Sequence, residues 1–324
     1  MTRARFGMTL IELLVVLAII GLLVALLLPA IHTVLESSRT SSCQNNLRQI
    51  GVAIMAYHHT FDSYPPGNVT KTAGICYGDG QSGGNGWPSD DGANWCLSIL
   101  RYLEQDNLYI AYNFEDFNEA GINRDVRQAY VPVLNCPSDM GANQLAVPAS
   151  GPACAGALNL SYRTGSYRAV SGRSDGVSFL DSAQLGTYKM EYRGPIHTIG
   201  VLQYSIERQK DVTDGLSETL LIGESFTSTS PAFRTFWAYA YAHYSLSSVT
   251  PQSRILIGNY DKCSATPGKG GSNPCRRGWG SNHAAGINFL YCDGVVRMTP
   301  LAVDMEVLAR LATIAESIDT AAPE

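Results

Sequence analysis

An apolar stretch near the amino terminus constrains this chain more than any other part of the sequence. Arg3 and Arg5 precede it, and from Leu13 to Leu28 no side chain is polar. As an α-helix, the 24 residues from Met8 to Ile31 would span about 36 Å, enough to cross the hydrocarbon core of a bilayer, which is about 30 Å thick. We therefore predict a membrane-spanning or filament-core helix over residues 8–31.

One carboxylate, Glu12, interrupts this stretch near its start. A charge inside a bilayer costs on the order of 2.5–3.5 kcal/mol on insertion scales and should have a partner of opposite charge. Cleavage after Gly7 would create an α-amino group at Met8, four residues before Glu12. A secretory signal peptide has a shorter apolar region, and a plain signal anchor gives no reason for Gly7 and Glu12 at this spacing.

This arrangement resembles the amino terminus of the type IV prepilin family, which has a basic leader, a Gly before the cut and a mature start similar to F-T-L-I-E. The resemblance implies that prepilin peptidase removes residues 1–7 after Gly7. It implies that Met8, where the family usually has Phe, becomes N-methylated, and that Glu12 acts in assembly. The implied partners are prepilin peptidase, other pilin or pseudopilin subunits and the lipid bilayer.

The remaining composition fits an exported domain. Lys and Arg number 23 and Asp and Glu number 28, and this net charge of −5, spread thinly, argues against binding to nucleic acid. Gly and Pro are plentiful, as expected of a loop-rich extracytoplasmic domain that contains β-strands. We predict an α+β fold in which the long helix packs on an antiparallel, β-rich and loop-rich globular head.

All eight cysteines lie beyond the apolar segment, and none forms a C-x-x-C pair. An even number in an exported chain favours disulfides. Cys263 and Cys275 bracket a loop rich in Gly, Pro, Ser and Asn, so we predict that they are bonded to each other. The other six allow 15 pairings, and for Cys43, on a helix face, a free buried thiol is an alternative. These six are Cys43, Cys76, Cys96, Cys136, Cys154 and Cys292.

The helix should continue beyond Pro29, because an apolar stripe recurs at spacings of four, three, four and three residues. The stripe consists of Cys43, Leu47, Ile50, Ile54 and Tyr57. Consecutive prolines after Tyr64 must end the helix. We therefore predict an amphipathic continuation over residues 32–62 and a head domain over residues 63–324.

Within the head, the clearest prediction is a hairpin, because alternating residues flank Asp293-Gly294, a strong turn signal. We predict helices over 95–112, with a short extended end, and over 305–318. Over 131–139 we predict a short strand that runs into a Pro turn. The other predicted strands are 162–170, 199–204, 219–224, 236–241, 254–257 and the hairpin pair 287–291 and 295–298.

Five sequence blocks carry a second resemblance, and they occur in order over nearly the whole chain: QNNLRQIGVAIMAYHHTFDSYPPG, LRYLEQDNLY, VLNCPSD, DVTDGLSETLLIGES and SNHAAGINFLYCDGVVRM. The chain is similar to a large bacterial prepilin-like family with an N-terminal cleavage and methylation motif, a domain of unknown function and a C-terminal H-x9-D-G signature. That signature corresponds here to His283, Asp293 and Gly294. The resemblance implies a pilin-like role and no established chemistry.

Two groups of residues are candidates for a metal site. His283 and Asp293 fall short of a ligand set, and a hairpin turn at Asp293 with a packed His283 explains them better. Asp211, Asp214 and Glu218 offer hard oxygen ligands of the kind that Ca²⁺ prefers. Calcium is therefore the one cofactor that the sequence leaves open.

Catalytic and nucleotide-binding motifs are unsupported. Residues 78–83 match G-x-G-x-x-G, but neither a preceding strand nor a following helix is evident. Residues 223–227 approach the nucleophile elbow G-x-S-x-G but end in Thr and lack a following helix. We predict no catalytic residues.

We therefore predict a non-enzymatic pilin-like or pseudopilin subunit, cleaved after Gly7 and assembled through its N-terminal helix into a filament or secretion pseudopilus. It should cross the cytoplasmic (inner) membrane once, with the head extracytoplasmic. Two alternatives remain. One is a membrane-anchored domain that binds a ligand such as glycan or Ca²⁺ and never polymerises, and the other is an anchored hydrolase.

Overall fold

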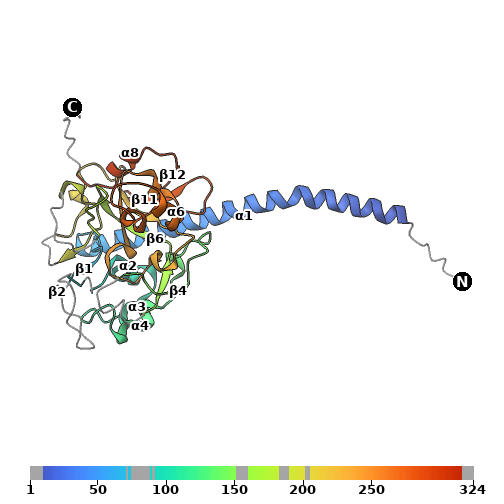
Figure 1. The fold of residues 1–324 in the computed structure, drawn as a ribbon. Coiled ribbons are helices and arrows are strands. Elements are labelled where there is room, and N and C mark those ends of the chain that lie inside the picture. Colours follow the sequence, from blue (N-terminus) through green and yellow to red (C-terminus); the bar gives the residue numbers. More distant parts are fainter. Residues whose placement is uncertain are drawn as a thin grey trace, which may run out of the picture.

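A single long helix, α1 (Leu10–Phe61), dominates the computed structural model. The model describes residues 10–70, 72–73, 88–89, 92–150, 160–181, 190–200 and 205–315. The first half of α1, from Leu10 to Leu35, extends away from the head, and we call it the arm. The second half of α1 runs into the head (Figure 1). The helix ends before the prolines, as predicted. Asp62, with a positive φ of 53°, turns the chain out of the helix.

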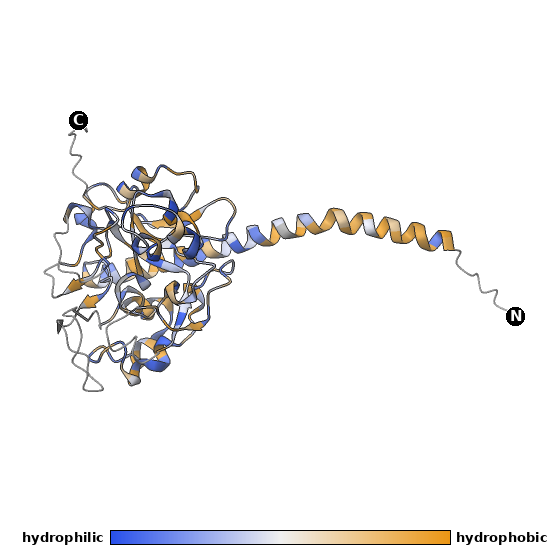
Figure 2. Ribbon diagram, in the orientation of Figure 1, coloured by the Kyte–Doolittle hydropathy of each residue, from blue (hydrophilic) through white to orange (hydrophobic). Residues whose placement is uncertain are grey.

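The arm is apolar, as its mostly hydrophobic colour in Figure 2 shows, and its large apolar side chains are exposed. Leu10 is 75 % exposed and Leu26 is 69 % exposed. Among the described residues, α1 is the one helix whose length and composition would allow it to cross a membrane. Such a surface is unfavourable in water and requires a lipid or protein environment.

The second half of α1 buries the predicted stripe in the head. Cys43, Leu47, Ile50 and Ile54 are fully buried, and Tyr57 is partly buried against the same core. On one side the helix contacts β11 (Ile287–Tyr291) and β12 (Val296–Thr299) of the main sheet. On the other side it contacts α2 (Trp95–Ile99) and the adjoining 3₁₀ helix (Figure 1). At Gly51 the helix lies so close to β11 that an added Cβ would lie 3.1 Å from the Leu290 side chain.

The main sheet has five strands in the order β10-β6-β8-β11-β12. Their bounds are Leu246–Val249, Tyr167–Arg173, Leu220–Glu224, Ile287–Tyr291 and Val296–Thr299. Neighbouring strands are antiparallel except β10 and β6, which are parallel. The α+β class is confirmed, with a mixed sheet where an antiparallel one was predicted. The strand β10 was not predicted.

The predicted hairpin is present as β11 and β12. Asp293 Oδ1 accepts a hydrogen bond of 2.9 Å from the backbone N–H of Val295, and Gly294 has a φ of 82°, which favours glycine. Asp293 also pairs with Arg297 at 2.7 Å. Turn geometry and this surface ion pair therefore account for Asp293 and Gly294.

Within the described ranges, the other elements are short. The remaining helices are α3 (Asp106–Ala111), α4 (Arg124–Arg127), α6 (Tyr260–Ala265), α7 (Asn273–Arg276) and α8 (Met305–Arg310). The remaining strands are β1 (Val69–Thr70), β2 (Thr72–Ala73), β3 (Pro88–Ser89), β4 (Leu145–Ala146), β5 (Tyr162–Gly165), β7 (Ile199–Gly200) and β9 (Thr235–Phe236). The 3₁₀ helices are Leu100–Leu103, Gly121–Asn123, Pro132–Leu134, Met190–Tyr192, Gln209–Asp211, Pro231–Phe233, Ala242–Tyr244 and Ser253–Leu256.

Two predicted strands are wrong. In place of the short strand predicted within 131–139 there is the 3₁₀ helix Pro132–Leu134, because proline at the first helical position suits a helical turn and lacks the N–H that a strand would use. The predicted turn follows it, where the Asp139 N–H donates to the Cys136 carbonyl at 2.9 Å. Residues 254–257 fall in the 3₁₀ helix Ser253–Leu256. There the buried Arg254 side chain donates to the carbonyls of Thr266 and Lys269, so tertiary contacts override the local preference.

Other predicted elements are interrupted or shorter. The helix predicted over 95–112 breaks at Glu104, which takes a left-handed conformation, and α3 takes the place of the extended end. The strand predicted over 162–170 divides at Ser166 into β5 and β6, and that over 236–241 reduces to β9. The strand predicted over 199–204 is β7 as far as Gly200, and residues 201–204 lie outside the described residues. The last helix, α8, ends at Arg310, and residues 316–318 lie outside the described residues.

Cysteine pairing is partly as predicted. Cys263 and Cys275 are joined by a disulfide, and short helices α6 and α7 occupy much of the loop region. Cys43 is bonded to Cys136, so the free-thiol alternative for Cys43 is wrong. Cys96 and Cys292 are free and buried. Cys76 and Cys154 lie outside the described residues.

Candidate functional site at the joint between helix and head

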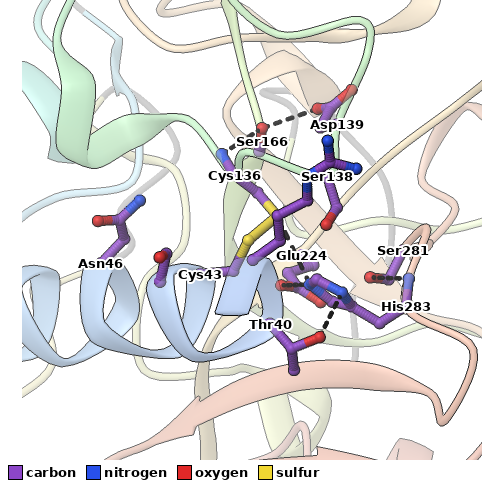
Figure 3. Close-up of a disulfide and its surroundings, with 12 residues drawn as sticks. Thr40, Cys43, Asn46, Cys136, Ser138, Asp139, Ser166, Glu224, Ser281 and His283 are labelled. Atoms are coloured by element: carbon purple, nitrogen blue, oxygen red, sulfur yellow. Dashed lines mark hydrogen bonds and ion pairs between the residues drawn. A yellow bond between two sulfur atoms is a disulfide. The ribbon is translucent and has the colours of Figure 1, made fainter. Parts of the chain in front are cut away.

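A buried polar cluster lies where α1 enters the head, and Figure 3 shows its centre. It contains Glu36 and Cys43 of α1, Cys136 of the loop that follows the 3₁₀ helix Pro132–Leu134, Glu224 and His283. We call these five residues the joint cluster. They come from four segments that are distant in the sequence, so the cluster fastens the helix to the head.

The local structure explains how these side chains meet. Glu36 and Cys43 are seven residues apart, two turns of α1, and therefore share one face of the helix. Glu224 ends β8, and His283 precedes β11, the strand beside β8. The Asn288 backbone N–H and side-chain amide donate to the two oxygens of Glu224 at 2.8 Å and 3.0 Å, which fixes the carboxylate.

His283 lies between two carboxylates. Its Nδ1 is 2.8 Å from Glu36 Oε1 and 3.0 Å from Thr40 Oγ1. Its Nε2 is 3.3 Å from Glu224 Oε1 and 3.6 Å from Cys136 Sγ. The His283 side chain is 1 % exposed and that of Glu224 is 3 % exposed, whereas Glu36 is 34 % exposed at the edge of the cluster.

The charges of the cluster favour a protonated His283. Burial by itself would lower the pKa of His283, but the hydrogen bonds and charges of Glu224 and Glu36 outweigh it, so that the pKa is raised. An imidazolium at this position neutralises the buried Glu224. Removal of one partner from a buried ion pair costs about 3–5 kcal/mol, because the other charge stays buried without compensation.

This raised pKa predicts a pH dependence of stability. Because the pKa of His283 is higher in the folded chain than in the unfolded chain, its contribution is fully present below the unfolded value of about 6.5 and is lost as the pH rises through the folded pKa. The unfolding free energy, measured by denaturant titration from acid to alkaline pH, should fall over that window. The decline should be absent in His283→Gln and retained in His59→Gln, which changes an exposed histidine of α1. An equal decline in both variants would contradict the assignment to His283.

The two parts of the predicted H-x9-D-G signature lie apart in the structure. His283 packs into the joint cluster, and Asp293 makes a turn beyond the other end of β11. Sequence reasoning found His283 but missed Glu36, Glu224 and the Cys43–Cys136 disulfide as its surroundings. One signal was available, since Glu36 is the only acidic residue between Glu12 and Asp62.

The three proposed calcium ligands do not come together. Asp211 Oδ2 accepts the backbone N–H of Arg208 at 2.8 Å, and Asp214 Oδ2 lies 3.5 Å from Thr313 Oγ1. Within the described ranges, the metal-compatible group of donor atoms is Cys43, Cys136, Glu224 and His283, and it includes neither these residues nor Glu218. Calcium binding therefore stays a prediction, and the described residues give it no preformed group of ligands.

The residues behind the hydrolase alternative have structural roles. Ser225 is buried, and its hydroxyl donates to the carbonyl of Gly278 at 3.0 Å. Glu224, within the same pentapeptide, belongs to the joint cluster. The glycine motif at 78–83 lies outside the described residues, as do Gly7 and Met8, and Glu12 lies on the exposed arm.

A bare apolar helix anchored by its second half in a globular head is the architecture of a type IV pilin-like protein. Residues 2–28 match the prokaryotic N-terminal methylation motif, which confirms this class and implies processing by prepilin peptidase. Residues 34–306 match the family described as protein of unknown function (DUF1559), and the chain belongs to that family. No curated protein and no solved structure matches the chain. The motif and the family indicate a structural protein.

Proposed function

We propose that this protein is a pilin-like subunit that is cleaved after Gly7, held in the cytoplasmic membrane by α1 and assembled through α1 into a filament or secretion pseudopilus. The observation that carries the proposal is the bare arm. Its large apolar side chains, from Leu10 to Leu35, are about half exposed or more, while the second half of the same helix is packed in the head. Only lipid or other apolar helices can cover such a surface.

Glu12 gives the arm a means of setting the position of each subunit. After cleavage, the α-amino group of Met8 is the nearest new positive charge in the sequence. In a filament of bundled helices, the Glu12 carboxylate of one subunit forms an ion pair with the α-amino group of a neighbouring subunit. A buried charge pair adds little net stability compared with an apolar pair, but it specifies register.

The orientation of the head follows from charge and cysteine chemistry. Arg3 and Arg5 precede the helix and stay on the cytoplasmic side. The Cys43–Cys136 and Cys263–Cys275 disulfides form and persist in an oxidising compartment, which supports a head outside the cytoplasm.

A cleft beside α1 favours a second function, ligand binding by an anchored head that does not polymerise. The cleft has a volume of about 590 Å³ and lies between α1 and the chain around residues 130–143. Its walls carry side-chain amides and the half-exposed ring of Tyr130, which suit a neutral polar ligand. The amides belong to Asn46, Gln49, Gln105, Asn135 and Asn143.

The decisive test is the fate of the leader. The intact mass of the wild-type chain from cells should correspond to a start at Met8 with one added methyl group. Because the peptidase requires a small residue before the scissile bond, Gly7→Leu should retain residues 1–7 and be absent from sheared surface fractions. Gly21→Leu, which alters a glycine with open space around it within the arm, serves as the control for cleavage. A wild-type start elsewhere, such as after Ala30, would refute the pilin function.

A further inference from the structure

We propose that Cys43, Cys136, Glu224 and His283 form a zinc site when the Cys43–Cys136 disulfide is reduced. One donor atom from each of these residues lies within 4.8 Å of the donor atoms of the other three, and all four residues are buried. Either the disulfide or the metal ion would then connect α1 to the head. The inference does not depend on filament assembly.

The donor set selects the metal. Two sulfurs, one imidazole nitrogen and one carboxylate oxygen suit Zn²⁺, which takes four such ligands in a tetrahedron at about 2.0–2.3 Å. Calcium and magnesium prefer oxygen ligands throughout and are disfavoured by the two sulfurs. Because the four segments are already packed around this point, the ion requires local separation of the two sulfurs and no rearrangement of the fold.

The surroundings of His283 match those of a metal-ligating histidine. Such a histidine usually donates its second ring N–H to a carboxylate, which fixes the ring and leaves the other nitrogen for the metal. Here Nδ1 lies 2.8 Å from Glu36 Oε1, while Nε2 faces Cys136 Sγ and Glu224. Glu224 is in turn held by the Asn288 backbone and side-chain amides. His283 and Glu224 are therefore oriented before any ion binds.

The charges also agree with a divalent cation. In the oxidised chain, the His283 ring faces the buried Glu224 carboxylate, with Nε2 3.3 Å from Oε1. In the reduced chain, Zn²⁺ compensates the charge of that carboxylate and has two thiolates, the carboxylate and neutral His283 as ligands. The formal charge of the ion and its ligands is −1, and Glu36 stabilises the N–H of the imidazole.

The chemical steps balance with an external thiol or phosphine reductant. The disulfide accepts two electrons and two protons to give two thiols, while a dithiol is oxidised to its own disulfide or a phosphine to its oxide with oxygen from water. Zn²⁺ then displaces the two thiol protons and, where His283 is protonated, the proton on its Nε2, and all of these protons go to solvent. The oxidised sulfurs carry no thiolate charge, so the oxidised chain should not bind zinc at this point.

Zinc content of the full-length chain in detergent micelles tests the proposal. The chain is reduced by a phosphine with zinc present throughout, freed of excess metal by gel filtration and assayed for zinc. We expect about one additional ion per chain relative to the oxidised protein. Cys43→Ser/Cys136→Ser should lose this ion, and His283→Gln and Glu224→Gln should weaken binding more than 100-fold. Glu36→Gln should weaken it about 10- to 100-fold, as loss of a supporting carboxylate does.

Two further measurements distinguish this site from other thiols. Cys263→Ser/Cys275→Ser and Cys96→Ser/Cys292→Ser should keep the ion, and cobalt substitution should give thiolate charge-transfer absorption that the Cys43→Ser/Cys136→Ser variant lacks. Circular dichroism of each oxidised variant establishes that it is folded. The proposal is overturned if the reduced wild type retains no additional zinc. It is also overturned if zinc is retained equally after Cys43→Ser/Cys136→Ser, or if His283→Gln and Glu224→Gln both bind it as tightly as the wild type.

Discussion

Replacing Glu12 by Gln should leave membrane insertion and cleavage intact and should reduce incorporation into filaments at least tenfold. Insertion should even become easier, because the substitution removes a charge from the apolar segment. In the filament, the incoming α-amino group would then meet no carboxylate in an apolar core. An uncompensated buried charge costs about 3–5 kcal/mol, and about 1.4 kcal/mol already corresponds to a tenfold loss.

The readout is the ratio of subunit in the membrane to subunit in sheared filaments. Glu115→Gln is the matched control, since Glu115 is an exposed carboxylate of the head. Glu36→Gln is unsuitable as a control because Glu36 belongs to the joint cluster, and its loss would weaken the contacts that hold α1 in the head. Normal incorporation of the Glu12→Gln chain would show that the carboxylate does not set register, and the anchored ligand-binding function would then gain support.

The features that the sequence predicted well depend on local patterns. The α1 helix follows from an apolar run and a stripe with helical spacing, and its end follows from consecutive prolines. The β11–β12 hairpin follows from Asp293-Gly294, whose conformational preferences act within a few residues. In each case the residues that determine the structure lie next to one another in the sequence.

The features that could not be predicted depend on distant contacts. The hydrogen bond between Glu36 and His283 joins residues 247 positions apart, and the Cys43–Cys136 disulfide joins residues 93 positions apart. Spacing along the chain therefore paired His283 with Asp293, whereas the fold pairs it with Glu36 and Glu224. The same limit explains the wrong strand at 254–257, where buried contacts of Arg254 determine the conformation.

The two disulfides that the structure describes should differ in their effect on stability. Cys43–Cys136 closes a loop with a sequence separation of 93, and Cys263–Cys275 closes one with a separation of 12. In the chain-entropy model, these loops correspond to about 4.5 and about 3 kcal/mol of unfolding free energy, respectively. Cys43→Ser/Cys136→Ser should therefore destabilise the oxidised chain more than Cys263→Ser/Cys275→Ser, as measured by denaturant unfolding of the full-length chain in micelles.

The two double-serine variants should also differ in which part of the structure loses stability. Cys43 lies at the first buried turn of α1, so its disulfide holds the helix where the bare arm begins. Without it, backbone amides of α1 between Cys43 and Ile54 should exchange hydrogen faster, and those of β11 should change less. In Cys263→Ser/Cys275→Ser, faster exchange should be confined to α6, α7 and their loop. Equal destabilisation of the two variants, with unchanged exchange in α1, would contradict this prediction. It would show that the packing of Leu47, Ile50 and Ile54 holds the helix in the head without a covalent bond.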